Sequence, residues 1–344
     1  MGIRDIAAFP FQALAVLSSA KSFSGNKVLA SPALNRIGLH RMRVELAERM
    51  ADSRRRWLRN LISEEQRERF DAQGFIQIDN VLHDDLFAEV TKELESTRFA
   101  SRELKQGNTV TRFITLSPKT LRRTPALAAA TRAPEFQGLL RYAGSRNSDP
   151  LVTLHTVLTK VGNGQTDPQT HFHSDTFHTT AKAWLFLRDV TEEDGPFSYV
   201  PASHRMTPER LEWEQRQSLS AAHHADPHHA AGSFRATRSE LAEMGYEPAV
   251  PLIVKANTLV VADTHGFHAR QPSRRPSVRI ALYGSVRGNP FNPFVGPDIM
   301  DLPGLRGRRA QLLDLARAAE ARLFRRREVQ PYVGDLFADD PPVL

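Results

Sequence analysis

The sequence predicts a mainly β protein with flanking helices, whose central strands form an antiparallel barrel or jelly roll. From residue 151 onward, short β-rich runs are separated by Gly, Asp, Asn and Pro, which favour turns. Long helices do not alternate with these runs, which argues against a doubly wound sheet or a (β/α)8 barrel. Among 344 residues, 40% are hydrophobic and 25% are charged, enough to bury a sizeable core. The runs are LVTLHTVLTKV, AWLFLRDV, FSYV, PLIV, TLVVAD and VRIALYGSV.

The N-terminal 62 residues carry the whole charge surplus of the chain. They hold eleven Lys and Arg against four Asp and Glu, while the formal net charge of the full chain is +7. An apolar set at roughly helical spacing precedes the basic cluster SRRRWLRN and predicts a helix that packs on the core with a solvated basic face. Contact with an anionic membrane surface is the alternative. No motif for nucleic acid accompanies the charge. The apolar set is Leu34, Ile37, Leu39, Met42, Leu46 and Met50.

Composition also restricts compartment and chemistry. The apolar stretch Ile6–Leu17 is too short to span a bilayer, contains Pro10 and lacks a clear cleavage site, so we expect a cytoplasmic protein. Peripheral association with the cytoplasmic membrane face stays open, because this stretch continues into basic sequence. The absence of cysteine excludes disulfides, thiolate zinc sites, iron–sulfur clusters and a cysteine nucleophile. Any metal must therefore be held by His, Asp or Glu.

A helix, a strand and a second helix lead into the β-rich region. Ser63 and Gln66 form a capping box at the start of the first helix, and Gly74 ends it. The strand FIQIDNVL follows, and residues 83–96 have the spacing of an amphipathic helix. Residues 205–250 interrupt the β pattern with the helix-prone TPERLEWEQRQ, and residues 306–327 indicate a basic helix. We therefore divide the chain into a basic extension (1–62), a β domain (63–300) with an insertion around 205–250, and a basic C-terminal helix and tail (301–344).

The insertion contains a histidine-rich loop, AAHHADPHHAAG. Its four histidines could bind a transition metal, but the location in an insertion favours a solvated loop. They are His223, His224, His228 and His229.

The segment HFHSDTFH, residues 171–178, provides the first part of a candidate metal site. His173 and Asp175 are two residues apart in a segment patterned as extended, so both side chains can converge on one ion. His268 is the preferred third ligand, with His265 as its competitor. Two histidines and one carboxylate indicate non-haem iron with three adjacent open positions.

An arginine on the last predicted strand supplies a second part of the site. In VRIALYGSV, Arg279 alternates with apolar neighbours eleven residues after His268, so it needs a carboxylate partner. A bidentate pair with the distal carboxylate of 2-oxoglutarate is the expected match. Arg274 and Arg275 are the alternative anchors.

These motifs together resemble the phytanoyl-CoA dioxygenase family of Fe(II)/2-oxoglutarate-dependent oxygenases. The resemblance covers roughly residues 63–290 and includes the HSD segment, the AWLFLRDV strand, EEDGPF, PASH, and HARQPSRRPSVR in order. It implies a double-stranded β-helix, a cupin-like jelly roll, that uses Fe(II), 2-oxoglutarate and O2. It also implies iron ligation by His173, Asp175 and His268, anchoring of 2-oxoglutarate by Arg279, and Trp184 beside the co-substrate.

The resemblance further implies a reaction type. Related halogenases carry a small residue in place of the carboxylate, so Asp175 favours hydroxylation. His171 and His178 are additional histidines near the motif, and we consider them as substrate contacts beside a structural role. His204 is expected to stabilise a turn near the pocket, and Trp184 could also be ordinary core.

We therefore expect hydroxylation of an aliphatic C–H with release of succinate and CO2. The expected substrate is a small or lipid-linked molecule, conceivably anionic. One alternative is a zinc-dependent hydrolase that uses His171, His173 and Asp175, although Thr176 stands where such a motif has a further histidine. The other alternative is a non-catalytic β-barrel binding protein.

Overall fold

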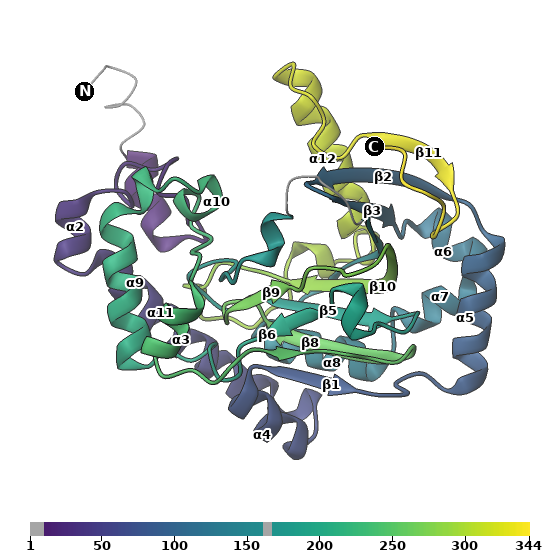
Figure 1. The fold of residues 1–344 in the computed structure, drawn as a ribbon, viewed down its shortest axis with the longest axis horizontal. Helices are drawn as coiled ribbons and strands as arrows, with labels where there is room; N and C mark the ends of the chain where they lie inside the picture. The colour runs from purple at the N-terminus through teal and green to yellow at the C-terminus, as the bar shows by residue number, and fades with distance from the viewer. Residues whose placement is uncertain (1–9, 161–166) are drawn as a thin grey trace.

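The computed structural model describes residues 10–160 and 167–344 and arranges them as two antiparallel sheets with helices around them (Figure 1). The larger sheet contains, in spatial order, β1 (Phe75–Ile78), β8 (Thr258–Asp263), β5 (Ala181–Phe186), β10 (Ser277–Val286), β4 (Leu151–Thr159), β3 (Thr109–Thr115), β2 (Phe99–Gln106) and β11 (Tyr332–Leu336). The smaller sheet contains β7 (Val250–Pro251), β6 (Phe197–Tyr199) and β9 (His268–Arg270). The predicted mainly antiparallel fold with flanking helices is confirmed.

The helices lie on the outside of the sheets and in the insertion. They are α2 (Pro32–Arg36), α3 (Leu39–Leu58), α4 (Glu64–Gln73), α5 (Asp84–Ser96), α6 (Pro118–Arg123), α7 (Pro125–Ala130), α8 (Pro134–Ala143), α9 (Pro208–Ser220), α10 (Pro227–Ala230), α11 (Arg238–Glu243) and α12 (Arg309–Leu323). None of these described helices combines the length and apolar character needed to cross a bilayer.

Alternation along the central strands gives the larger sheet two different faces. Leu282 of β10 and Leu185 of β5 are fully buried with Phe136 of α8 in the main apolar cluster. Each such side chain contributes about 1.5–3 kcal/mol to the burial free energy. The opposite face carries Trp184 and Ala281, which belong to a cluster shared with the smaller sheet. The face that α8 does not cover is therefore the one that packs toward the smaller sheet.

Local signals at the entrance helix produce the predicted structure. The side chain of Ser63 accepts a hydrogen bond from the backbone of Gln66, whose side chain accepts one from the backbone of Ser63. Gly74 ends α4 with φ of 81°, a left-handed conformation that glycine adopts without a steric penalty. The strand and helix expected after it appear as β1 and α5.

The expected burial of the α3 region is wrong in its detail. Four members of the predicted apolar set are exposed, namely Leu34, Ile37, Met42 and Leu46. Arg43, Arg54 and Arg55 are buried instead, because their guanidinium groups have specific acceptors. Arg54 donates to backbone carbonyls at residues 145, 290 and 292, and Arg55 pairs with Asp263 at 2.8 Å. Much of the basic cluster thus serves packing. The apolar stretch Ile6–Leu17 lies partly outside the described residues, at positions 6–9.

The segment expected to be a strand at residues 171–178 is a loop with one isolated β-bridge position, at His173. Its backbone is held instead by bonds to separate partners: His173 pairs with His268, and Asp175 N–H donates to the carbonyl of Thr264. The end of the run predicted at residues 151–161 falls on Val161, which lies outside the described residues.

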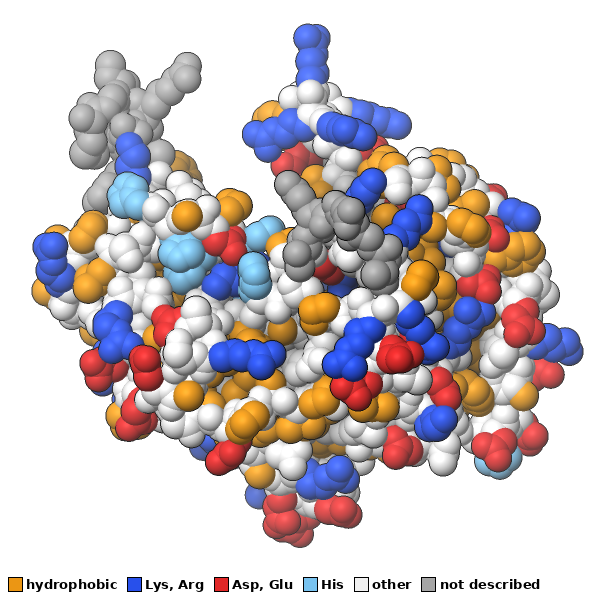
Figure 2. Space-filling model, viewed as in Figure 1, with side chains coloured by type: hydrophobic (Ala, Val, Ile, Leu, Met, Phe, Trp, Pro, Cys, Tyr) orange, Lys and Arg blue, Asp and Glu red, His pale blue; other side chains and the backbone are white. Residues whose placement is uncertain are grey.

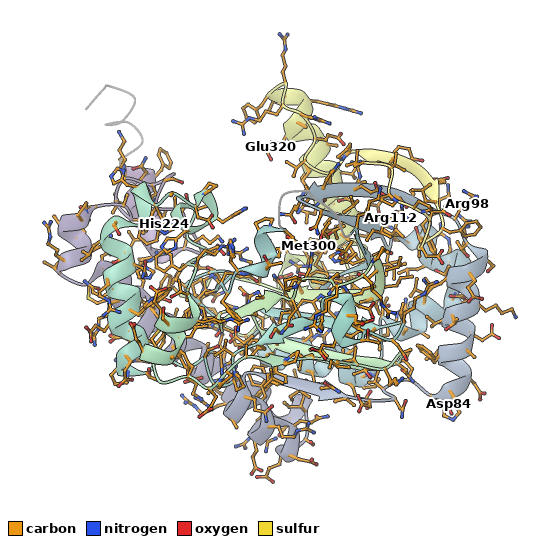
Figure 3. All side chains as sticks on the ribbon, viewed as in Figure 1. Asp84, Arg98, Arg112, His224, Met300 and Glu320 are labelled. Atoms are coloured by element: carbon orange, nitrogen blue, oxygen red, sulfur yellow. The ribbon has the colours of Figure 1, made fainter. Side chains whose placement is uncertain are left out.

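Three further strands occupy the edge of the larger sheet, in segments for which the sequence predicts no strand. Strands β2 and β3 form a hairpin, and β11 from the C-terminal tail pairs with β2. Arg112 and Glu103 form a fully buried ion pair at 2.7 Å within this hairpin. Arg112 also donates to the carbonyls of Phe337 and Asp340, and Figure 3 labels it beside this edge. A buried charged pair hides the apolar alternation that would identify such strands.

The insertion and the C-terminal helix extend from the sheets on either side of a hollow. Figure 2 shows this hollow between the lobe of α9–α11, with histidine side chains on its surface, and α12, whose free end carries basic side chains that are all arginine in the sequence. His223, His224 and His228 are exposed, as the solvated-loop interpretation predicts, whereas His229 is buried and stacks on His224. Within the described residues, these histidines form no group with metal-ligand spacing.

Candidate metal and co-substrate site

Three side chains converge at the edge of the smaller sheet. Ligand atoms of His173, Asp175 and His268 all lie within 4.8 Å of one another, the one such group among the described residues. Nε2 of His173 and Nε2 of His268 lie 3.9 Å and 3.7 Å from Oδ1 of Asp175. The two histidines form a reciprocal backbone pair, with both N···O distances at 3.0 Å. The residues predicted as metal ligands are therefore brought together.

Second hydrogen bonds fix the tautomers of both histidines. Nδ1 of His173 lies 2.8 Å from the carbonyl of His171, and Nδ1 of His268 lies 2.9 Å from the carbonyl of Gly266. A carbonyl only accepts, so each Nδ1 carries the proton and each Nε2 offers its lone pair to the shared space. Burial lowers the pKa of His268 to about 4 and that of His173 well below its ordinary value. Both rings are neutral at physiological pH, as metal ligation requires.

A lysine orients the carboxylate of the group. Nζ of Lys182, on β5, lies 2.6 Å from Oδ2 of Asp175, while Oδ1 faces the two histidines. Burial by itself favours the protonated acid, but Lys182, His268 and His173 outweigh it and hold the pKa of Asp175 well below its ordinary value. One carboxylate oxygen is therefore engaged by the lysine, and the other is available to a metal.

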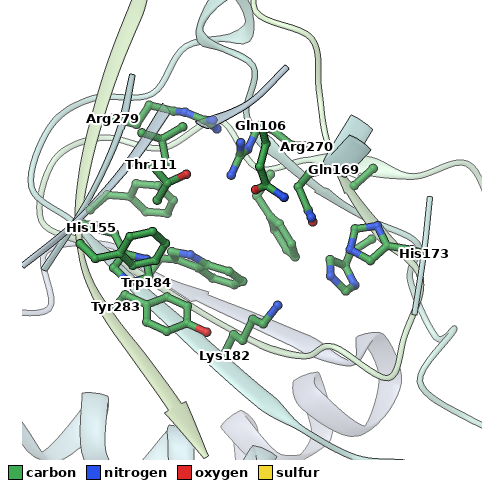
Figure 4. A pocket seen from close by; sticks show the side chains of 17 residues that line it. Gln106, Thr111, His155, Gln169, His173, Lys182, Trp184, Arg270, Arg279 and Tyr283 are labelled. Carbon is green, nitrogen blue, oxygen red and sulfur yellow. The ribbon is translucent and has the colours of Figure 1, made fainter. Parts of the chain in front are cut away.

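A cavity of about 220 Å³ is lined at one end by His173 and His268, and Arg279 lines it as well (Figure 4). The side chains of Arg279, Ala281 and Tyr283 line it, as the strand parity predicts, with Trp184 across the β5–β10 pair. Arg279 donates through one terminal nitrogen, Nη1, to the carbonyl of Gly195, while its Nε and Nη2 are buried and have no partner in the described part of the chain. Burial, and then the nearby Arg270, lower the pKa of Arg279 to about 9. A buried guanidinium with two free N–H donors indicates a site for a carboxylate.

Aromatic rings form the walls between these two ends of the cavity. Trp184 packs against Phe197, with ring centroids 4.7 Å apart, and edge-on against Tyr283 at 6.0 Å. His155 stacks on Tyr283 at 4.1 Å, and its ring nitrogen bonds to Thr153. Burial lowers the pKa of His155 to about 3, so this ring is a neutral wall element. These walls limit the access of water to the cavity.

The competing residues have other partners. His265 is buried with Nδ1 at 2.8 Å from the carbonyl of Thr176, outside the ligand group. Arg274 and Arg275 pair with Glu192 and Asp194 on the surface. The structure therefore favours His268 and Arg279 for the two predicted roles.

Three further histidines named from the sequence do not line the cavity. The side chain of His171 is exposed, and its contribution is the carbonyl that orients His173. His178 and His204 are buried around a separate small cavity beside α3. Both ring nitrogens of His204 lack a partner, so the expected turn-stabilising hydrogen bonds are not made. For His171 and His178, substrate contact stays a prediction that this geometry does not support.

Sequence reasoning missed the two lysines at Asp175. Lys182 stands two residues before Trp184, so strand parity could have placed it in the cavity. Lys21 donates from the N-terminal extension to the backbone carbonyl of Asp175 at 2.5 Å, and no local pattern in the sequence indicates that contact.

The fold and the site together define a class: a jelly-roll protein with a two-histidine, one-carboxylate metal site and a buried arginine in the same cavity. Residues 70–281 match the sequence profile described as phytanoyl-CoA dioxygenase (PhyH). The chain belongs to this family, and the expected family resemblance is confirmed. It is accordingly a non-haem iron, 2-oxoglutarate-dependent enzyme in its broad class.

Solved structures with a similar arrangement include three metal-bound or co-substrate-bound proteins. HygX from Streptomyces hygroscopicus with nickel and 2-oxoglutarate bound is 16% identical, with 65% of this chain and 86% of that chain covered and a TM-score of 0.40. The epimerase SnoN with Fe3+, alpha ketoglutarate and nogalamycin RO is 20% identical, with 70% and 90% covered and a TM-score of 0.41. EctD from S. alaskensis with bound Fe is 15% identical, with 65% and 76% covered and a TM-score of 0.39. No curated protein sequence matches this chain. The family assignment therefore rests on the sequence match.

Proposed function

We propose that this protein hydroxylates an aliphatic C–H bond of a small-molecule or lipid-linked substrate. One O2 and one 2-oxoglutarate are consumed, the C–H becomes C–OH, and succinate and CO2 are released. The observation that carries this proposal is the buried Arg279, which lines the same cavity as His173 and His268 and whose Nε and Nη2 have no partner among the described residues. A dicarboxylate that chelates a metal at one end and binds an arginine at the other fits this pairing.

The donor set fits Fe(II) on the chemistry of its atoms. Two neutral imidazole nitrogens and one carboxylate oxygen are the ligands of facial-triad iron sites, and His173, His268 and Asp175 present these atoms to one another. When bound, the iron supplies the oxygen chemistry that amino-acid side chains lack.

The protein residues orient the reactants and exclude water. The carbonyls of His171 and Gly266 hold the histidine tautomers, and Lys182 holds one carboxylate oxygen of Asp175. Arg279 fixes the distal carboxylate of the co-substrate through donors that are already desolvated, so little reorganisation accompanies binding. The carboxylate of Asp175 occupies the position that a halide needs in related halogenases, which supports hydroxylation.

The test is anaerobic addition of Fe(II) and 2-oxoglutarate to the full chain. We expect a visible metal-to-ligand charge-transfer band that disappears in His173→Ala and persists in the control His171→Ala, whose exposed side chain lies outside the ligand group. A folded protein without the band, or a band unaffected by His173→Ala, contradicts the assignment. Substrate-dependent succinate release then measures turnover, with the uncoupled rate subtracted.

The same variants distinguish the alternatives. A zinc hydrolase of the His-x-His-x-Asp type needs the side chain of His171, which is exposed and outside the group of ligand atoms in the described residues. It also leaves the free donors of Arg279 without a role. Loss of metal binding in His171→Ala supports that alternative. A binding protein without catalysis forms no succinate with any substrate.

A further inference from the structure

Two amines meet at the residue that is the proposed carboxylate ligand. Nζ of Lys182 contacts Oδ2 of Asp175 at 2.6 Å, and Nζ of Lys21 contacts its backbone oxygen at 2.5 Å. Lys21 is held in place by its surroundings. The N–H groups of residues 23 and 24 both donate to the carbonyl of Ala230, and a Cβ added to Gly232 would lie 2.1 Å from the carbonyl of Lys21. The N-terminal segment is therefore packed against the insertion, with its amine at the metal site.

Two arginines extend this positive region. Arg235 is the bridge partner of His173, and its guanidinium contacts Asp226 at 3.3 Å. Arg287 lies two residues beyond Ser285, which pairs with Lys182, so it continues the cavity-facing parity of β10. Arg287 is exposed, and no described residue forms an ion pair or hydrogen bond with its side chain.

The other three cations act electrostatically on Lys21. Burial first, and then Arg287, Lys182 and Arg235, lower the pKa of Lys21 to about 8, while the charge of Asp175 opposes this shift. The same Arg287 also acts electrostatically on Lys182.

The charges at this place do not balance within the protein. The four cations face two carboxylates, Asp175 and Asp226, and a divalent metal and 2-oxoglutarate cancel each other's charge. Two positive charges therefore remain when both are bound. Lys21, Lys182 and Arg235 are partly buried, and positive charge in such places is costly without a counter-ion. Together with the exposed Arg287, this surplus indicates an anionic group on a further ligand.

We propose that Lys21, Lys182, Arg235 and Arg287 bind a phosphate monoester of the substrate beside the metal, so that the enzyme acts on a phosphorylated small molecule. A phosphate dianion matches the surplus of two and offers three oxygens to several donors, whereas a carboxylate or sulfate ester brings one negative charge. Lys182 and Arg279 lie on opposite sides of the cavity, so this subsite does not compete with the co-substrate anchor (Figure 4).

One member of the subsite belongs to the N-terminal extension. Lys21 lies well before the matched residues 70–281. The N-terminal extension would then take part in substrate binding directly, and its role would exceed packing. This inference rests on the proposed function, because it uses the charge of the bound metal and 2-oxoglutarate.

The experiment measures binding of inorganic phosphate by calorimetry to the full-length protein, metal-free and loaded with Mn(II) and 2-oxoglutarate. We expect about tenfold weaker phosphate binding in Lys21→Gln and in Arg287→Gln, since each removes one charged donor. Arg56→Gln is the matched control, because Arg56 is an exposed arginine of the same basic extension and is not among the charges that act on Lys21. Lys21→Arg keeps the charge and is expected to retain most of the affinity if Lys21→Gln unfolds.

Several outcomes overturn the proposal. Phosphate affinity that is unchanged in Arg287→Gln and in a folded Lys21 variant removes the subsite, and an equal loss in Arg56→Gln indicates nonspecific attraction. If phosphate binds only in the presence of Mn(II) and its affinity is the same in both variants, the phosphate binds to the metal and the proposal is wrong. A charge-transfer band with no phosphate binding refutes this inference and leaves the proposed function intact. Phosphate binding without a charge-transfer band supports this inference and contradicts the proposed function, because the metal-free measurement tests the cations alone.

Discussion

Replacing Arg279 by methionine separates the functional benefit of a buried guanidinium from its energetic cost. Its Nη1 donates to the carbonyl of Gly195, and its buried Nε and Nη2 have no partner within residues 10–160 and 167–344. Two charge-assisted hydrogen bonds to a carboxylate contribute about 3–5 kcal/mol together. Arg279→Met should therefore weaken 2-oxoglutarate binding about 10²- to 10⁴-fold.

The same substitution should stabilise the protein when no co-substrate is present. Methionine removes a desolvated charge, and replacing buried charges by apolar side chains of similar size gains about 1–4 kcal/mol. The carbonyl of Gly195 loses its hydrogen bond in this variant, which reduces the gain in stability by about 1 kcal/mol. We expect the free energy of unfolding in urea to rise by about 1–3 kcal/mol in Arg279→Met.

The assay titrates 2-oxoglutarate anaerobically into the Fe(II)-loaded protein and follows the charge-transfer band. Arg274→Gln is the control, because Arg274 is the alternative anchor and its side chain is 70% exposed beside Glu192. Arg279→Lys should bind weakly, since an ammonium lacks the planar pair of donors. Co-substrate affinity within threefold of wild type in Arg279→Met, or a loss of stability in that variant, refutes the reasoning.

Three other predictions follow from the packing around the site. Arg55→Leu should lower the free energy of unfolding by about 3 kcal/mol, because the buried carboxylate of Asp263 loses its ion-pair partner. The neighbouring control Arg56→Gln should change the free energy of unfolding by less than about 0.5 kcal/mol. Equal effects of the two variants in urea unfolding contradict this prediction. Lys182→Met should weaken Mn(II) binding about 10- to 100-fold by freeing Asp175 to rotate, and unchanged calorimetric affinity counts against an orienting role. The metal-free protein should lose stability as pH falls from about 6.5 to 4, because the pKa of His268 is about 4 when folded and the unfolded chain binds the proton first. At pH 5 this histidine alone lowers the free energy of unfolding by about 2 kcal/mol relative to pH 7. His268→Asn should reduce this loss of stability in urea unfolding.

Local chemistry made part of the fold predictable. The capping box of Ser63 and Gln66 and the left-handed Gly74 depend on neighbouring residues alone, and α4 has the predicted bounds within a residue. The alternation around Arg279 gave the correct cavity face of β10 because a strand's period is independent of its partners. The ligand group formed as predicted, even though residues 171–178 are a loop.

Tertiary acceptors explain what the sequence left open. The burial of Arg54 depends on carbonyls at residues 145, 290 and 292, which no periodicity can reveal. The β2–β3 hairpin lacks a clear apolar alternation because its buried face contains the ion pair of Glu103 and Arg112. Lys21 reaches the site through contacts with the insertion, so its position depends on how two distant segments pack.

The reciprocal backbone pair of His173 and His268 gives the metal a mechanical consequence. The backbones of His173 and His268 form one hydrogen-bonded pair, and the centroids of their rings lie 4.3 Å apart. His268 belongs to the smaller sheet, whose strands are only two or three residues long. A metal ion held by both histidines would join segments that lie far apart in the sequence across this small sheet. Amide hydrogen exchange at β6 and β9 should then slow when metal binds, while the amides of β5 and β10, in the eight-stranded sheet, keep their rates. Metal binding at His173 and His268 would then also stabilise the smaller sheet against local opening.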